Sequence, residues 1–189
     1  MRSIAVALVF IPVSLLIGAR SEYLSIKHKF QSIQSEQLKP GTRIALPSRE
    51  LNAYVQTELP KVAPTGIRNP SVDLQANNIA VGRATINFLH LQNAQGTPPN
   101  WLMKKLLNGE HDVVVTTQLS SNKGYATVDL KSVEVDGLTV QGPALDFLVR
   151  NYLMPNYPNA KIGTPFKLDY KLERLEVTPG VAYAVIGKP

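Results

Sequence analysis

Residues 111–135, HDVVVTTQLSSNKGYATVDLKSVEV, contain the clearest structural pattern in the chain. Two runs rich in β-branched residues, His111–Ser120 and Tyr125–Val135, flank the segment Ser121-Asn122-Lys123-Gly124. Asn followed closely by Gly supplies the positive-φ positions that a tight hairpin turn requires. Apolar and polar side chains alternate along both runs, as is typical of strands with one buried face. The segment therefore predicts an antiparallel β-hairpin.

The residues after the hairpin predict one helix and two strands. The helix begins at Gly142-Pro143 and extends to about Met154, with apolar residues on one side. Phe166–Val177 alternates as a single long strand, and Val181–Ile186 forms the last strand. Thr178-Pro179-Gly180 joins these strands, because Pro then Gly at the central positions is typical of a type II turn.

The residues before the hairpin predict a similar mixture of elements. A short strand, Thr42–Leu46, leads to a helix that Ser48 caps and Pro60 ends. Pro64, Gly66 and Pro70 indicate a loop. Further strands are predicted at Ser71–Gln75, Ile79–Gly82 and Arg83–Leu91, with a turn at Ala76-Asn77-Asn78, and a short helix at Trp101–Asn108. Residues 42–189 are therefore expected to form a single α+β domain, an antiparallel sheet with helices on one face.

The N-terminus carries an apolar segment, Ile4–Ala19, which follows Met1 and Arg2 and ends at Arg20. A helix of about 16 residues is roughly 24 Å long, shorter than the ~30 Å hydrocarbon core of a bilayer. Residues 1–20 are thus expected to be either a cleaved signal peptide or an uncleaved signal anchor, preceding the domain as an N-terminal hydrophobic helix. Residues 21–41 are expected to form a stalk or linker helix, and the alternative is an amphipathic helix on the membrane surface.

Composition excludes some classes of function. The net charge is +6, from 20 Lys and Arg against 14 Asp and Glu, but the basic residues are scattered. A nucleic-acid-binding protein more often has a basic stripe with interleaved aromatic residues, so no nucleic acid partner is expected. Scattered positive charge suits an anionic membrane surface, or serves solubility alone. The chain has no cysteine, which excludes disulfides and thiolate ligands.

Motifs for catalysis are missing from the sequence. His28, His90 and His111 are far apart and match no metal-binding spacing, so surface or strand-edge roles are expected for them. Most acidic residues alternate with apolar residues along strands, which places them on a solvated face. No GxSxG, GxxxxGK[ST] or GxGxxG motif occurs. The sequence therefore predicts a protein that is not an enzyme and has no metal or cofactor.

Two surfaces remain as candidate sites. The predicted Trp101 helix is apolar on most sides, so it either plugs the core or contacts a membrane through Trp101, Leu102, Lys104 and Lys105. The interior of a curled sheet either is fully packed or forms an apolar pocket. The side chains expected to line such a pocket are Ile86, Phe88, Val113, Val115, Ala126, Val128, Leu148, Tyr152, Leu168 and Tyr170.

The chain resembles the small YceB-like bacterial envelope proteins over about residues 42–187. The resemblance rests on the order of the elements, on the helix start Pro47-Ser48-Arg49-Glu50-Leu51-Asn52 and on the closing Glu176-Val177-Thr178-Pro179-Gly180. It implies a tubular lipid-binding (TULIP-like) architecture, in which a strongly bent antiparallel β-sheet wraps amphipathic helices. The chain differs from that family in lacking a lipidated cysteine and in a late helix that Pro155 cuts short.

These observations predict a domain exported across the bacterial inner membrane to the periplasm, with residues 4–19 as its anchor if the segment is not cleaved. The expected partner is a membrane lipid or another apolar small molecule held inside the sheet. The alternative is a structural or accessory envelope protein that binds a protein partner through a sheet edge or the Trp101 helix.

Overall fold

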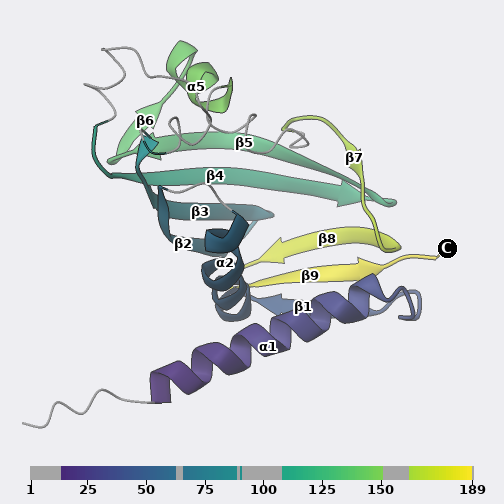
Figure 1. The fold of residues 1–189 in the computed structure, drawn as a ribbon. Helices are drawn as coiled ribbons and strands as arrows, with labels where there is room; N and C mark the ends of the chain where they lie inside the picture. Colours follow the sequence, from purple (N-terminus) through teal and green to yellow (C-terminus); the bar gives the residue numbers. More distant parts are fainter. Residues whose placement is uncertain (1–13, 63–65, 89, 91–107, 151–161, 189) are drawn as a thin grey trace, which may run out of the picture.

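A computed structural model describes residues 14–62, 66–88, 90, 108–150 and 162–188 of the chain. The fold is α+β, with mostly antiparallel strands that do not close into a barrel. Three helices are described in these residues: α1 (Ser14–Gln34), α2 (Ser48–Val62) and α5 (Pro143–Leu148). In Figure 1, α1 lies along the side of β1, whereas α5 lies at the other end of the molecule, beside β6.

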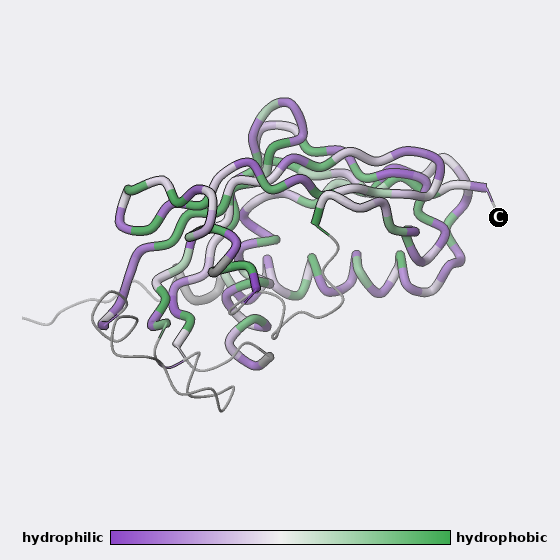
Figure 2. The backbone as a smooth tube through the Cα atoms, turned by 90° about the horizontal axis from the view of Figure 1, so that it is seen from above, coloured by the Kyte–Doolittle hydropathy of each residue, from purple (hydrophilic) through white to green (hydrophobic). Residues whose placement is uncertain are grey.

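The strands form two sheets. The three-stranded sheet has the order β1-β9-β8 and consists of β1 (Arg43–Pro47), β8 (Leu172–Thr178) and β9 (Val181–Ile186). The larger sheet has the order β2-β3-β4-β5-β6, and a short β7 also pairs with β5. Its strands are β2 (Ile67–Gln75), β3 (Ile79–Ile86), β4 (His111–Asn122), β5 (Tyr125–Val135), β6 (Leu138–Val140) and β7 (Phe166–Lys167). Figure 2 shows that α1 lies to one side of the strands.

The predicted β4–β5 hairpin is confirmed. Its strands are antiparallel, and the turn consists of Lys123 (φ 51°) and Gly124 (φ 79°), both with positive φ. A bulge shifts the register, because Thr116 pairs with Ser132 whereas Thr117 pairs with Leu130. The extra residue, Lys131, reverses the alternation along β5, so the apolar side chains on both sides of the bulge point to the same face.

The predicted strand Phe166–Val177 is wrong, since it is two strands in different sheets. β7 pairs with β5 of the larger sheet, whereas β8 pairs with β9 of the smaller one. Between them, Tyr170 (φ 56°) and Lys171 (φ 57°) form a tight turn, closed by the hydrogen bond from Leu172 N to Asp169 O at 3.1 Å. The alternation of FKLDYKLERLEV continues through the turn, which has no Gly or Pro to mark it.

The strands before the hairpin also differ from the prediction. β2 begins at Ile67, inside the predicted loop, and a register shift between Arg68 and Ser71 accommodates Pro70. β3 is one strand where two were predicted, and it ends at Ile86 instead of Leu91. The Asn77–Asn78 turn is confirmed, with φ of 61° and 59°. Two features were not predicted, namely β6 and the Asp136-Gly137 turn that precedes it.

The helix α1 crosses the predicted boundary at Arg20 and continues to Gln34. The apolar segment 4–13 lies outside the described residues, and the expected separate N-terminal hydrophobic helix is not supported. Within the described residues, no helix has the length and apolar character needed to cross a membrane. The residues predicted as a stalk or linker helix are helical up to Gln34, and this helix packs on the domain, where Ile26 is 0% exposed and Ile33 is 6% exposed.

The helix α2 begins at Ser48 as predicted, but the cap is not formed. The Oγ atom of Ser48 is buried and has no hydrogen-bond partner among the described residues, while its backbone N–H donates to Gly180 O at 2.8 Å. Pro60 lies inside the helix, which ends at Val62.

Asn52 connects α2 to the larger sheet. Its side-chain amide accepts a hydrogen bond from Val72 N–H and donates one to Val72 O, both at 2.8 Å. This amide therefore satisfies part of the open edge of β2.

The two sheets meet along the outer edge of β8. Glu173 O accepts from Gly124 N–H at 2.8 Å, and Val177 N–H donates to Asn78 Oδ1 at 2.8 Å. Between them, the hydroxyl of Ser121 accepts from Leu175 N–H at 2.8 Å and donates to Leu175 O at 2.6 Å. Alternate residues of β8 are thus satisfied by turn and side-chain groups of the larger sheet. These backbone groups on the outer edge of β8 therefore have hydrogen-bond partners although no described strand pairs with that edge.

Candidate ligand-binding face

The apolar residues of the domain form two separate clusters. The α1 cluster has Ile26, Ile33, Leu46 and Ala184 as its buried members and lies between the three-stranded sheet and α1 and α2. The α5 cluster has Phe88, Val113 and Val133 as its buried members. Partly buried residues packed on the α5 cluster are Ile67, Ile86, Val115, Leu130, Val135, Val140, Leu145 and Leu148. The α5 cluster therefore involves the larger sheet and the short helix α5.

The registers of the larger sheet explain why the α5 cluster forms on one face. Val113 pairs with Val135 and Val115 with Val133, and directly paired residues point to the same face of a sheet. The neighbouring strand β3 contributes Gly82 and Ala84 opposite these valines. Val113 is buried (7% exposed) and Val115 is half-buried beside these small residues. Leu145 and Leu148 of α5 cover the opposite end of the cluster.

The predicted pocket-lining residues are only partly brought together. Five of them belong to the α5 cluster, namely Ile86, Phe88, Val113, Val115 and Leu148. Ala126 and Leu168 are buried (2% and 8% exposed) near the hairpin turn, and Val128 is half-buried. Tyr170 is 43% exposed in the turn after β7 and lies outside the α5 cluster, but it lines an open cleft there together with Leu168. Tyr152 lies outside the described residues.

His111 lies at the rim of the α5 cluster. Its ring centroid is 5.9 Å from that of Phe88, and its side chain is 14% exposed. The Nδ1 atom lies 2.7 Å from Asp136 Oδ2, and the Nε2 atom is buried with no hydrogen-bond partner in the described part of the chain. His111 begins β4, as the prediction of a surface or strand-edge role assumed, but its side chain is mostly buried. The Asp136-Gly137 dipeptide is the sequence signal, not used in the prediction, that could have placed Asp136 in a turn between β5 and β6.

Asp136 is held by two donors. Besides His111, the backbone N–H of Asp112 donates to its Oδ1 at 2.9 Å. These hydrogen bonds, the one from His111 first, lower the pKa of Asp136 from its ordinary value. Asp136 is consequently a carboxylate near neutral pH and can only accept hydrogen bonds. It therefore orients the imidazole ring of His111.

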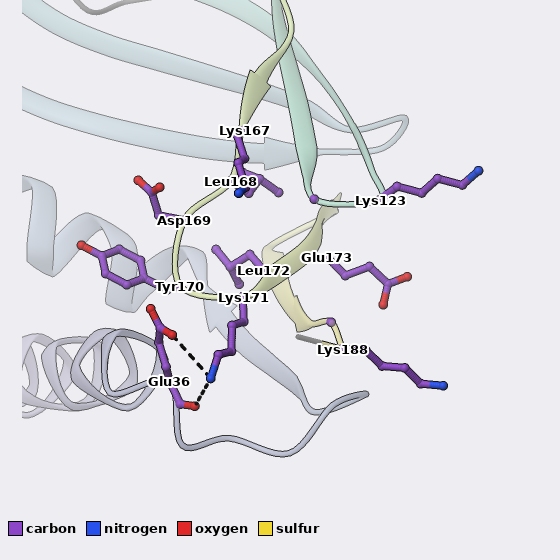
Figure 3. A pocket seen from close by; sticks show the side chains of 12 residues that line it. Glu36, Lys123, Lys167, Leu168, Asp169, Tyr170, Lys171, Leu172, Glu173 and Lys188 are labelled. Carbon is purple, nitrogen blue, oxygen red and sulfur yellow. Dashed lines mark hydrogen bonds and ion pairs between the residues drawn. The ribbon is translucent and has the colours of Figure 1, made fainter.

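A cleft lies away from the α5 cluster, around the hairpin turn and the turn between β7 and β8 (Figure 3). It is an open cleft of about 760 Å³. The Nζ atom of Lys171 lies 3.2 Å from Glu36 O and 3.5 Å from Glu36 Oε2. Lys123, Lys167 and Lys188 also line it and have no ion-pair partner among the described residues. Asp169 and Glu173 offset much of this positive charge, so the cleft favours no ligand class clearly.

The remaining predicted sites give less information. Trp101, Leu102, Lys104 and Lys105 lie outside the described residues, so membrane contact there stays a prediction. Among the sheet edges, β6 exposes Leu138, which is 74% accessible. No group of three or more His, Asp or Glu side chains in the described ranges is arranged to hold a metal ion.

The α5 cluster combines apolar residues from several strands with one buried polar atom at its rim, the arrangement typical of sites for apolar ligands. No family model matches the sequence, and no curated protein is significantly similar to it.

Proposed function

We propose that this protein is a non-enzymatic domain that binds a lipid or another apolar ligand on the α5 cluster. One observation carries the proposal: each cluster has eight partly buried apolar side chains, but the described helix over the α5 cluster is six residues long, whereas the α1 cluster has helices of 21 and 15 residues. An apolar sheet face gains stability when it is covered. A bound acyl chain is well suited to supply that cover.

The α1 cluster supports this interpretation by contrast. Its sheet has three strands and is packed against two long helices of 21 and 15 residues. The larger sheet has more strands and a shorter described helix. The two halves of the domain thus differ in how much of their apolar surface the described helices cover. The less covered half is the one we assign to the ligand.

The proposal includes the cellular location of the domain. The apolar segment 4–19 and the net charge of +6 suit a domain that is exported across the bacterial inner membrane and acts beside a membrane. The segment would be a signal peptide or an anchor. In this proposal the two sheets, joined along β8, act as one strongly bent sheet of the tubular lipid-binding type, as the resemblance to YceB-like proteins implies. A membrane would then be the source of the ligand.

Native mass spectrometry of the full chain purified from bacterial membranes tests the proposal. We expect the wild-type protein to retain a bound lipid. Leu148→Lys places a charge among the apolar side chains of the α5 cluster and is expected to abolish retention. Leu138→Lys makes the same change at a residue that is 74% exposed, and this matched control is expected to retain the lipid.

Unfolding curves of both variants accompany the experiment, so that lost binding is not confused with lost folding. Repeated recovery of folded wild-type protein without lipid would overturn the proposal. Equal loss of lipid in both variants would show that the ligand does not bind on the α5 cluster.

A further inference from the structure

The buried Nε2 atom of His111 distinguishes the α5 cluster from an ordinary apolar core. We propose that the ligand of this cluster carries a hydrogen-bond donor, a hydroxyl or an amine, that binds the Nε2 atom of His111. This inference rests on the proposed function and adds the chemical class of the ligand. It predicts a long apolar molecule with a neutral or cationic donor at one end, and not an anionic lipid.

The geometry at the other ring nitrogen determines the role of Nε2. Asp136 is a carboxylate, so the contact of 2.7 Å between its Oδ2 and His111 Nδ1 requires a proton on Nδ1. A neutral imidazole then has its lone pair on Nε2, which can only accept a hydrogen bond. The ring is held in this tautomer by Asp136, which the Asp112 N–H fixes in turn. In its neutral form, His111 is thus oriented as an acceptor at Nε2 before any ligand binds.

The position of Nε2 connects it to the apolar site. His111 is paired with Ile86 across β3 and β4, and its ring contacts Phe88. Both neighbours belong to the α5 cluster. Nε2 has no partner within the described ranges, and a ligand that supplies a donor removes the cost of burying an unpaired acceptor. The buried atom would therefore fix the polar end of the ligand at the rim of the cluster, while the chain lies on the sheet.

The surrounding charges favour a donor over an anion. Asp136 is a carboxylate beside the ring, and the Asp112 carboxylate accepts a hydrogen bond from Thr85 Oγ1 at 3.2 Å. The neighbouring Glu110 forms an ion pair with Arg68. Asp136 thus places a negative charge beside the ring, and the Glu110–Arg68 pair adds no net charge. A fatty-acid carboxylate or a phosphate at Nε2 would be repelled, whereas a hydroxyl or ammonium group would not.

The experiment compares three ligands with the same chain length: 1-dodecanol, its methyl ether and dodecanoate. Each ligand displaces a neutral fluorescent dye from the full chain at pH 8, below its own micelle concentration. We expect the alcohol to bind about tenfold more tightly than the ether, because the ether has no donor. In His111→Phe, which keeps an aromatic ring beside Phe88, the alcohol and the ether are expected to bind equally. His28→Phe, at an exposed histidine of α1, is the matched control and should keep the tenfold difference.

Each outcome decides the question. Equal binding of alcohol and ether to the wild-type protein would overturn the inference while leaving the proposed function intact. Tightest binding of dodecanoate would also overturn it, because an anion would then be the preferred head group. Absence of binding by all three ligands would overturn the proposed function, and the inference with it. If His111→Phe does not fold, His111→Gln keeps an acceptor in its amide oxygen and should preserve part of the preference for the alcohol.

Discussion

The α1 cluster and the α5 cluster both consist of apolar side chains on a β-sheet, but they differ in how deeply their central residues are buried. In the α1 cluster, Ile26 and Ala184 are 0% and 1% exposed. In the α5 cluster, the most buried residue, Phe88, is 4% exposed, and each cluster also has eight partly buried apolar side chains. The difference arises from the length of the described helices that cover each sheet. One cluster therefore stabilises the domain, and the other is the part we expect to bind a ligand.

Polar contacts strengthen the same contrast. Glu50 of α2, which is 7% exposed, accepts from Lys29 Nζ at 2.7 Å and from Ser25 Oγ at 3.1 Å. The hydroxyl of Tyr23 donates to Glu58 further along the two helices. These contacts satisfy a buried carboxylate and fix α1 to α2. At the α5 cluster, the buried nitrogen of His111 has no partner in the described residues. The Oγ atom of Ser48 at the start of α2 is also buried without a partner in the described residues, so the contact of the His111 ring with Phe88 is what connects its unsatisfied atom to a binding role.

The largest effect is expected in the α1 cluster. Ile26→Ala removes a fully buried side chain from the contact between α1 and the three-stranded sheet, and should lower the free energy of unfolding by about 3 kcal/mol. Urea unfolding of the full chain measures this change. Leu24→Ala on the same helix, at a residue that is 54% exposed, is the control and should change stability little. Equal effects of the two variants would mean that α1 is not docked.

A smaller effect is expected where the two sheets meet. Ser121→Ala leaves the N–H and C=O groups of Leu175 without their partner, and should destabilise the domain by about 2 kcal/mol. Ser120→Ala, the exposed neighbour on β4, serves as the control. Hydrogen exchange of the Leu175 amide should speed up in Ser121→Ala only. An unchanged exchange rate would show that the contact does not hold the sheets together.

A still smaller effect on stability is expected in the α5 cluster. Val115→Ala removes two methyl groups from a half-buried side chain and should lower the free energy of unfolding by about 1 kcal/mol. The same variant should reduce the increase in melting temperature that a bound alcohol produces, because it removes part of the contact surface. Thermal unfolding with and without 1-dodecanol measures both. A destabilisation as large as that of Ile26→Ala would remove the distinction between the clusters.

The smallest effect on stability is expected from protonation of the Asp136 carboxylate at low pH. The folded state lowers the pKa of Asp136 below its ordinary 3.8, so this carboxylate stabilises the fold above that value, and the contribution is lost as the pH falls through the lower pKa. Asp136→Asn should therefore be slightly less stable than the wild type at pH 7 and equal to it at about pH 2. Urea midpoints across this range give the comparison. A difference that persists unchanged in acid would contradict the role of the Asp136 charge.

The sequence predicts short-range features of this protein well. The β4–β5 hairpin, the Asn77–Asn78 turn and the turn at Pro179-Gly180 were predicted from residues that tolerate positive φ, and Gly180 has φ of 76°. The start of α5 at Pro143 was predicted from proline at a helix start. Among the predicted pocket-lining residues, those of β4 and the adjacent end of β3 were placed in one cluster correctly. Each of these depends on neighbours in the chain.

The tertiary structure decided the features that depend on distant partners. The break at Tyr170 and Lys171 follows from pairing with two different sheets, which alternation cannot indicate. Ser121 contacts Leu175 across a separation of 54 residues, and His111 meets Asp136 across 25. The helix α1 became part of the core because the three-stranded sheet offers it an apolar face. Turns are determined by the φ preferences of single residues, whereas burial and strand pairing are determined by which surfaces meet once the chain has folded.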